Sequence, residues 1–177
     1  MTAAAAALVL AWKTRLAQLG LAYKGKEPVA ARVDRSWPGG GARLTGETAL
    51  VTARLSLEPA ADEAAAEKRL GDLRARLLAP FDGEMSYPGM VTREFSVPAP
   101  LRPRALPAKD RSLWVIPATD RLSYGAGSDE LASRRAVVSL RYCPKSKSVF
   151  QLELFWKAKD FDEAQAVEEE SQYACAE

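Results

Sequence analysis

Alternating apolar and polar side chains predict β-strands in three parts of the chain. Residues 29–34 alternate around Val29 and Val33, and residues 49–57 show the clearest alternation, with an apolar residue at every odd position. We expect these two strands to pair across the glycine-rich turn at 37–41, where proline fixes φ and glycine permits a positive φ. Apolar residues at 91–97 and 113–116 predict two further short strands.

The third part, residues 135–157, predicts a β-hairpin around a turn at 144–147. Both flanking runs alternate, and we expect their larger apolar side chains to share one face of the hairpin. These side chains are Ala136, Val138, Leu140 and Tyr142 on the first strand, and Phe150, Leu152, Leu154 and Trp156 on the second. The opposite face, which includes Arg141 and Cys143, is then the more polar one.

Three segments show the spacing of amphipathic helices. Residues 3–19 are rich in alanine and leucine and are followed by Gly20, a residue that favours the end of a helix. Residues 62–78 form one apolar stripe, made of Ala66, Leu70, Leu73 and Leu77. A capping box of Asp160 and Glu163 predicts a last helix, whose stripe is Ala164, Val167, Ser171 and Cys175.

Strands that follow strands, with helices before, between and after them, predict an α+β fold. We expect a single domain over residues 21–177, built on a mostly antiparallel sheet that two or three helices cover on one face. Residues 1–20 leave two interpretations open. They form an alanine-rich helix, or they are the remnant of a secretion signal, because residues 3–12 have the length of a signal h-region and Val9-Leu10-Ala11 suits a cleavage site. No positively charged segment precedes that run.

Composition removes several classes of function. The chain has 177 residues and no histidine, so it lacks the usual neutral-pH general base and the commonest metal ligand. Its 25 basic and 23 acidic side chains nearly balance, at a net charge of +2, which argues against a nucleic-acid partner. No apolar run reaches the roughly 20 residues of an integral membrane helix. We therefore expect no catalytic residue of the common kinds, no metal and no cofactor.

The two cysteines, Cys143 and Cys175, predict a disulfide. Cys143 lies at the hairpin turn, and the last helix brings Cys175 close to it if that helix folds back over the hairpin. An even number of cysteines outside a Cys-x-x-Cys motif is typical of an oxidising compartment. The alternative is that Cys143 is a small buried side chain and that Cys175 lies in a frayed tail.

Two loops and one tryptophan are the candidate contact sites. The loop at 120–129 combines carboxylates, hydroxyls and glycines that let backbone N–H groups approach an anion; its candidate ligand residues are Asp120, Ser123, Tyr124, Gly125, Gly127, Ser128 and Asp129. A proline-rich basic segment and an aromatic residue beside a turn suit a protein partner, through Trp37, Arg102, Arg104, Lys109 and Arg111. The simpler interpretations are an ordinary turn, a helix cap at Ser128 and a solvated proline loop.

These patterns favour a protein that binds rather than catalyses. We expect an accessory or assembly protein of the bacterial cell envelope, periplasmic in location, that contacts another protein through a sheet edge or the proline-rich loop. The bacterial source is inferred from the alanine-, arginine- and leucine-rich composition. Two alternatives stay open. One is a small carboxylate-dependent hydrolase or transferase with its site around Asp120 and Asp129, and the other is a cytosolic small-ligand-binding domain with a pocket between sheet and helix.

Overall fold

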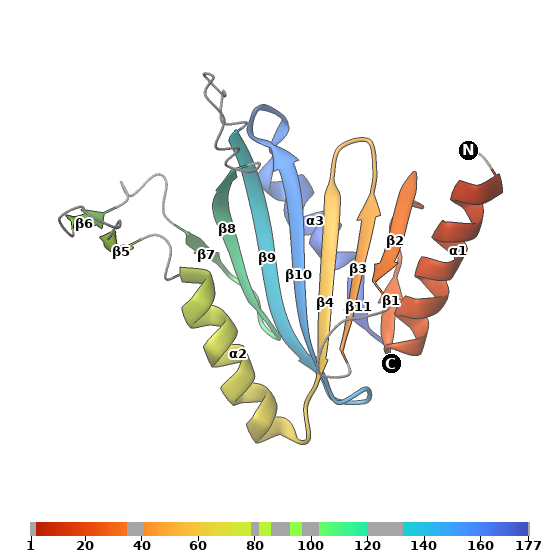
Figure 1. Ribbon diagram of the computed structural model, residues 1–177, viewed down its shortest axis with the longest axis horizontal. Helices are drawn as coiled ribbons and strands as arrows, with labels where there is room; N and C mark the ends of the chain where they lie inside the picture. The colour runs from red at the N-terminus through yellow and green to blue at the C-terminus, as the bar shows by residue number, and fades with distance from the viewer. Residues whose placement is uncertain are drawn as a thin grey trace.

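A seven-stranded antiparallel sheet, drawn from both halves of the chain, forms the centre of the molecule (Figure 1). The computed structural model describes residues 3–34, 41–78, 82–85, 93–96, 103–119 and 133–176. Within these ranges the strand order is β2-β3-β4-β10-β9-β8-β7. The strands are β2 (Ala30–Asp34), β3 (Ala42–Glu47), β4 (Thr52–Pro59), β7 (Arg104–Leu106), β8 (Ser112–Thr119), β9 (Ser133–Cys143) and β10 (Ser148–Lys157).

The remaining elements are helices and two small sheets. The helices are α1 (Ala3–Gln18), α2 (Glu63–Leu78) and α3 (Glu163–Ser171), with a 3₁₀ turn, η4 (Ala158–Asp160), after β10. One small sheet pairs β1 (Leu21–Tyr23) with β11 (Tyr173–Cys175), and the other pairs β5 (Asp82–Met85) with β6 (Arg93–Ser96). The predicted α+β class with a mostly antiparallel sheet is confirmed.

The predicted hairpin at 135–157 is present as β9 and β10. The prediction of which side chains of the two strands share a face is wrong. Cys143 lies opposite Ser148, so each even-numbered residue of β10 lies opposite an odd-numbered residue of β9. Leu154 therefore shares a face with Val137, and Phe150 shares one with Arg141. Alternation defines the two faces of each strand, whereas the length of the turn decides which faces coincide.

Both faces of the sheet consequently carry a hydrophobic core. The first core lies under α1, α3 and the β1–β11 pair, and its largest members are Trp12, Leu44, Leu55, Leu57, Val137, Phe150, Leu152, Leu154 and Trp156. The second core lies under α2, where Leu70, Leu73 and Leu77 pack against Trp114, Ile116, Ala136, Val138 and Leu140. Two helices, α1 and α3, thus cover one face, as expected, and α2 covers the other, because β8 and β9 carry apolar side chains on both sides.

Strand β3 was not expected. Because it lies between β2 and β4, these two strands do not pair directly, and the predicted pairing of residues 29–34 with 49–57 is wrong. The segment 42–47 contains Gly46, and a glycine at this position predicts a break between two strands. In the structure β3 lies between β2 and β4 and pairs with both. A Cβ at Gly46 would lie 3.2 Å from the Trp12 ring and 3.6 Å from Pro28 Cβ. The glycine is therefore a place of close packing inside a strand, not a turn.

The helix starts and ends follow the sequence signals at two of the three helices. α1 ends at Gln18, before Gly20 at φ 73°, and α2 begins after Asp62, whose Oδ1 accepts the Ala65 N–H at 2.8 Å. At α3 the cap is Asp162, which accepts the Gln165 N–H, rather than the predicted Asp160. Asp160 belongs to η4 instead, since the chain leaving β10 makes a 3₁₀ turn first.

The last helix is shorter than predicted. It ends at Ser171, and Cys175 lies in β11, where it is opposite Leu21 of β1. The change from helix to strand buries Tyr173, whose ring centroid lies 4.6 Å from that of Tyr23. The burial of this aromatic side chain and the pairing with β1 compensate for the shorter helix.

Candidate binding surfaces

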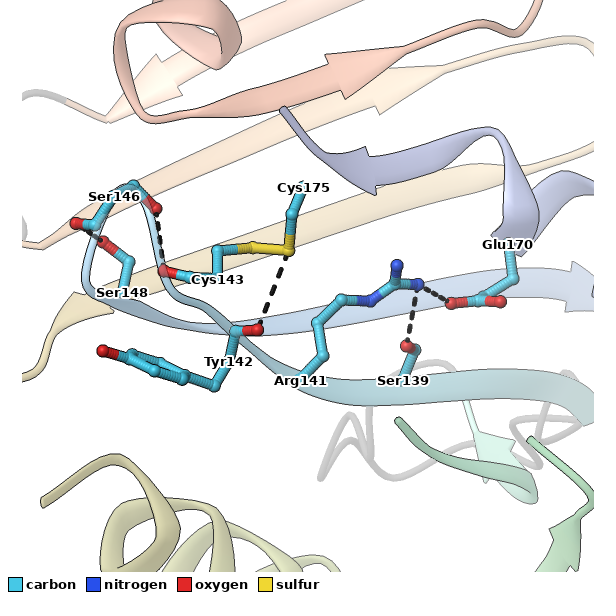
Figure 2. The surroundings of a disulfide bond; sticks show 8 residues. All are labelled: Ser139, Arg141, Tyr142, Cys143, Ser146, Ser148, Glu170 and Cys175. Atoms are coloured by element: carbon cyan, nitrogen blue, oxygen red, sulfur yellow. Dashed lines mark hydrogen bonds and ion pairs between the residues drawn. A yellow bond between two sulfur atoms is a disulfide. The ribbon is translucent and has the colours of Figure 1, made fainter. Parts of the chain in front are cut away.

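The cysteines are joined, as predicted. Cys143 and Cys175 form a disulfide with an S–S distance of 2.03 Å and a Cα–Cα distance of 5.4 Å (Figure 2). Cys143 is buried at the end of β9, and Cys175 is half-buried in β11. The bond therefore ties the last described strand of the chain to the central hairpin, although through a strand and not through the helix that we expected.

A buried cluster of charges lies beside the disulfide. Glu170 of α3 has no exposed surface and accepts hydrogen bonds from Arg141 of β9 and from Arg111, whose Nε lies 3.0 and 2.9 Å from the two carboxylate oxygens. Figure 2 shows Arg141 between Glu170 and Ser139. Burial lowers the pKa of Arg141, and the charge of Glu170 opposes that effect. The cluster is a structural ion-pair network in the core.

Glu170 does not stand out in the sequence. Three consecutive glutamates near the end of a helix are usually solvated, and nothing in the triplet distinguishes the buried one. The available signal was spacing, because Glu170 stands four residues after the buried Ala166 and three before Tyr173. The stripe predicted for this helix followed Val167 and Ser171 instead.

The structure describes two of the arginines proposed as partner contacts, and both have partners within the chain. Arg104 forms an exposed ion pair with Glu163 of α3. Arg111 is held by Glu170 and by Asp110, whose Oδ1 lies 2.7 Å from its Nη1. The hydrogen bond from Arg111 lowers the pKa of Asp110. Arg111 therefore serves the core cluster, with only 18% of its side chain exposed.

Lys109, another predicted contact residue, is exposed in the turn between β7 and β8. The remaining predicted contact residues lie outside the described residues. They are Trp37, Arg102, Asp120, Ser123, Tyr124, Gly125, Gly127, Ser128 and Asp129. Their proposed roles, including the carboxylate-dependent site at 120–129, stay predictions.

The two edge strands of the main sheet leave few backbone groups free to pair with a further strand. At one edge α1 lies alongside β2 (Figure 1). At the other, β7 has three residues and stands between Pro103 and Pro107, which cannot donate a backbone hydrogen bond. Short, proline-flanked or helix-covered edges discourage the addition of a further strand. Contact through a sheet edge is therefore less suited to this fold than contact through its helices and turns.

A polar cleft opens between α2 and the turn that joins β7 to β8. Its volume is about 460 Å³. Glu63 and Glu67 of α2 form one wall, and Lys109 and Arg111 belong to the opposite side. Its other lining residues are Ala66, Leu70, Asp110, Ser112, Leu140, Arg141, Tyr142 and Pro144.

Four large exposed hydrophobic side chains belong to α1 and to the ends of the strands beside it. Among the described residues, Leu8, Leu10, Val29 and Leu50 are 54% to 66% exposed. Val29 and Leu50 lie at the same end of the sheet, because the start of β2 is paired with the end of β3. Figure 1 shows that α1 also starts at this end. Leu8 and Leu10 follow in the first half of α1, two positions apart and therefore on different sides of the helix. We call these four residues the apolar end.

A groove of about 600 Å³ continues from the apolar end along α1. Leu10 belongs to both, and the groove then follows Ala7, Ala11 and Thr14 towards Val33 of β2. The hydrophobic surface of α1 is therefore split. Val9, Trp12 and Leu16 are buried, the last two of them in the first core, while Leu8 and Leu10 are exposed.

Comparison with protein-family models, with curated protein sequences and with solved structures finds no match to this chain. Among the described residues, no helix has the length and apolar character to cross a membrane. The same residues contain no group of three or more Cys, Asp or Glu side chains placed to hold a metal ion.

Proposed function

We propose that this protein is a non-enzymatic accessory or assembly protein that binds another protein through its apolar end. The single observation that carries the proposal is that Leu8, Leu10, Val29 and Leu50 are exposed and belong to elements that meet at one end of the sheet. Single exposed apolar residues are common on protein surfaces, whereas several of them on neighbouring elements suit an interaction site. The groove along α1 extends that surface beyond the four side chains.

We further propose the bacterial cell envelope as the place of action. The disulfide between Cys143 and Cys175 supports this part of the proposal, since such bonds persist in oxidising compartments and are rare in reducing ones. The bacterial source still rests on composition alone.

Site-specific photo-crosslinking in the cells that produce the chain tests the proposal. A photoreactive residue at position 10 or 50 should give one discrete cross-linked product, because these positions belong to the proposed contact surface. Position 78 is the matched control: Leu78 is also an exposed leucine, 40% accessible, but it ends α2. It should give no such product.

A second substitution connects the product to the apolar end. Leu8→Glu and Val29→Glu should each reduce the yield from position 10 by about tenfold, because burying a carboxylate at an apolar contact is costly. Leu78→Glu should leave the yield unchanged. Equal products from positions 10 and 78, or no product from position 10, would contradict the proposed function.

A further inference from the structure

The polar cleft has two oppositely charged sides that do not contact each other. Glu63 and Glu67 are four residues apart and so share one face of α2. Lys109 and Arg111 approach from the β7–β8 turn. Among the described residues, no ion pair joins the glutamates to the two basic side chains. The open space between them is the 460 Å³ of the cleft.

The charges on the two sides differ in how firmly they are already engaged. Arg111 is bound to Glu170 and Asp110, and Arg141 is bound to Glu170 as well. The side chains of Lys109, Glu63 and Glu67 form no hydrogen bond or ion pair with the described part of the chain, and all three residues are exposed. One ammonium group and two carboxylates thus stay available across the cleft, on opposite sides of it.

Apolar side chains complete the lining. Leu70 of α2 is half-buried and Pro144 of the β9–β10 turn is exposed, so these two residues present apolar surface to the cleft, whereas Ala66 and Leu140 are almost fully buried. A pocket of about 300–1,000 Å³ in which apolar surface lies between a few separated polar groups is typical of small-molecule sites. A ligand that fits this lining has an apolar body, a cationic end and an anionic end.

We propose that the cleft binds a short apolar peptide with free amino and carboxyl ends. The amino end lies against Glu63 and Glu67, the carboxylate lies against Lys109, and the apolar body covers Leu70 and Pro144. Charge-assisted hydrogen bonds at both ends then select the orientation of the peptide. This inference uses none of the residues of the apolar end and is independent of the proposed function.

Binding of the dipeptide Leu-Leu, compared with its N-acetyl form and its C-terminal amide, tests the inference. We expect saturable binding of Leu-Leu, followed by NMR shifts of the backbone amides around residues 63–70 and 109–112. Each blocked form should bind about tenfold more weakly, because it loses one charged end. Absence of saturable binding up to about 10 mM Leu-Leu, or equal affinity for the three compounds, would overturn the inference.

Substitutions on each side of the cleft test which end of the peptide that side binds. Lys109→Gln should abolish the preference for the free carboxylate and keep the preference for the free amine. The double variant Glu63→Gln/Glu67→Gln should do the reverse. Lys68→Gln, the matched control, changes an exposed charge of the same helix outside the cleft and should keep both preferences. Loss of both preferences in Lys109→Gln, with an unchanged circular dichroism spectrum, would also contradict the proposed orientation.

Discussion

Glu170 shows how a single side chain depends on its partners. Its carboxylate is buried, and two arginines supply the hydrogen bonds that replace water. The two partners are not equivalent. Arg111 has a second carboxylate, Asp110, while Glu170 is the one acidic partner of Arg141 within the described residues. Arg141 also lies 5.5 Å from the centroid of the Phe150 ring, inside the first core.

This asymmetry predicts unequal effects of two substitutions. Glu170→Gln leaves the buried Arg141 without a carboxylate and should lower the free energy of unfolding by about 3–5 kcal/mol. Arg141→Met should cost less, because Glu170 keeps its hydrogen bonds to Arg111 and the methionine fills apolar space. Urea denaturation of both variants measures the difference, with the exposed neighbour substitution Glu168→Gln as a control near zero. Equal losses in Glu170→Gln and Arg141→Met would contradict this account of the cluster.

At the scale of elements, the segment from α3 to β11 is held to the sheet by three different interactions. Glu170 binds the arginines, β11 pairs with β1, and the disulfide joins β11 to β9. β11 has three residues and cannot be stable on its own. The disulfide therefore stabilises β11, the part of this segment with the fewest backbone hydrogen bonds of its own.

Removal of the disulfide should be measurable at the level of this segment. The double variant Cys143→Ser/Cys175→Ser lacks the covalent loop that restricts the unfolded chain. For a sequence separation of 32 we expect a loss of about 3.5–4 kcal/mol in the free energy of unfolding. Hydrogen exchange should show the largest loss of protection in β1 and β11. Reductant should destabilise the wild type by a similar amount and leave the double variant unchanged. A wild type that is indifferent to reductant would contradict the prediction.

At the scale of the whole molecule, the two cores share one set of strands. Val137 faces the first core and its neighbour Val138 faces the second, so β9 cannot leave one core without leaving the other. The long chain connection between β4 and β10, which pair in the middle of the sheet, joins the two halves of the sequence. We expect the two cores to unfold together.

Tryptophans on the two faces provide the measurement. Trp12 and Trp156 lie in the first core, and Trp114 lies in the second. Trp37, the fourth tryptophan, is replaced by phenylalanine in both variants. In Trp37→Phe/Trp114→Phe the fluorescence then comes from Trp12 and Trp156 of the first core, and in Trp12→Phe/Trp37→Phe/Trp156→Phe it comes from Trp114 of the second core. Within each variant, the denaturation midpoints from fluorescence and from far-UV circular dichroism should coincide, as in a two-state transition. An earlier fluorescence transition in either variant would show that one core unfolds alone.

Local signals in the sequence were sufficient for much of the secondary structure. Alternation identified β2, β4, β9 and β10, and Gly20 and Asp62 marked an end of α1 and a start of α2. These features depend on neighbours within a few residues, so a periodic pattern and a capping residue determine them. The disulfide was also predicted, since two cysteines allow a single pairing within the chain.

Tertiary contacts decided the rest. Gly46 continues a strand because the Trp12 ring packs against it, and Glu170 is buried because Arg141 and Arg111 lie opposite α3. The hairpin register placed Arg141 in the core and set helices on both faces of the sheet. The sequence alone determined α1, α2 and the alternating strands β2, β4, β9 and β10, since those patterns are local. Only the folded structure decided which faces meet and which charges are buried, because both depend on residues distant in the chain.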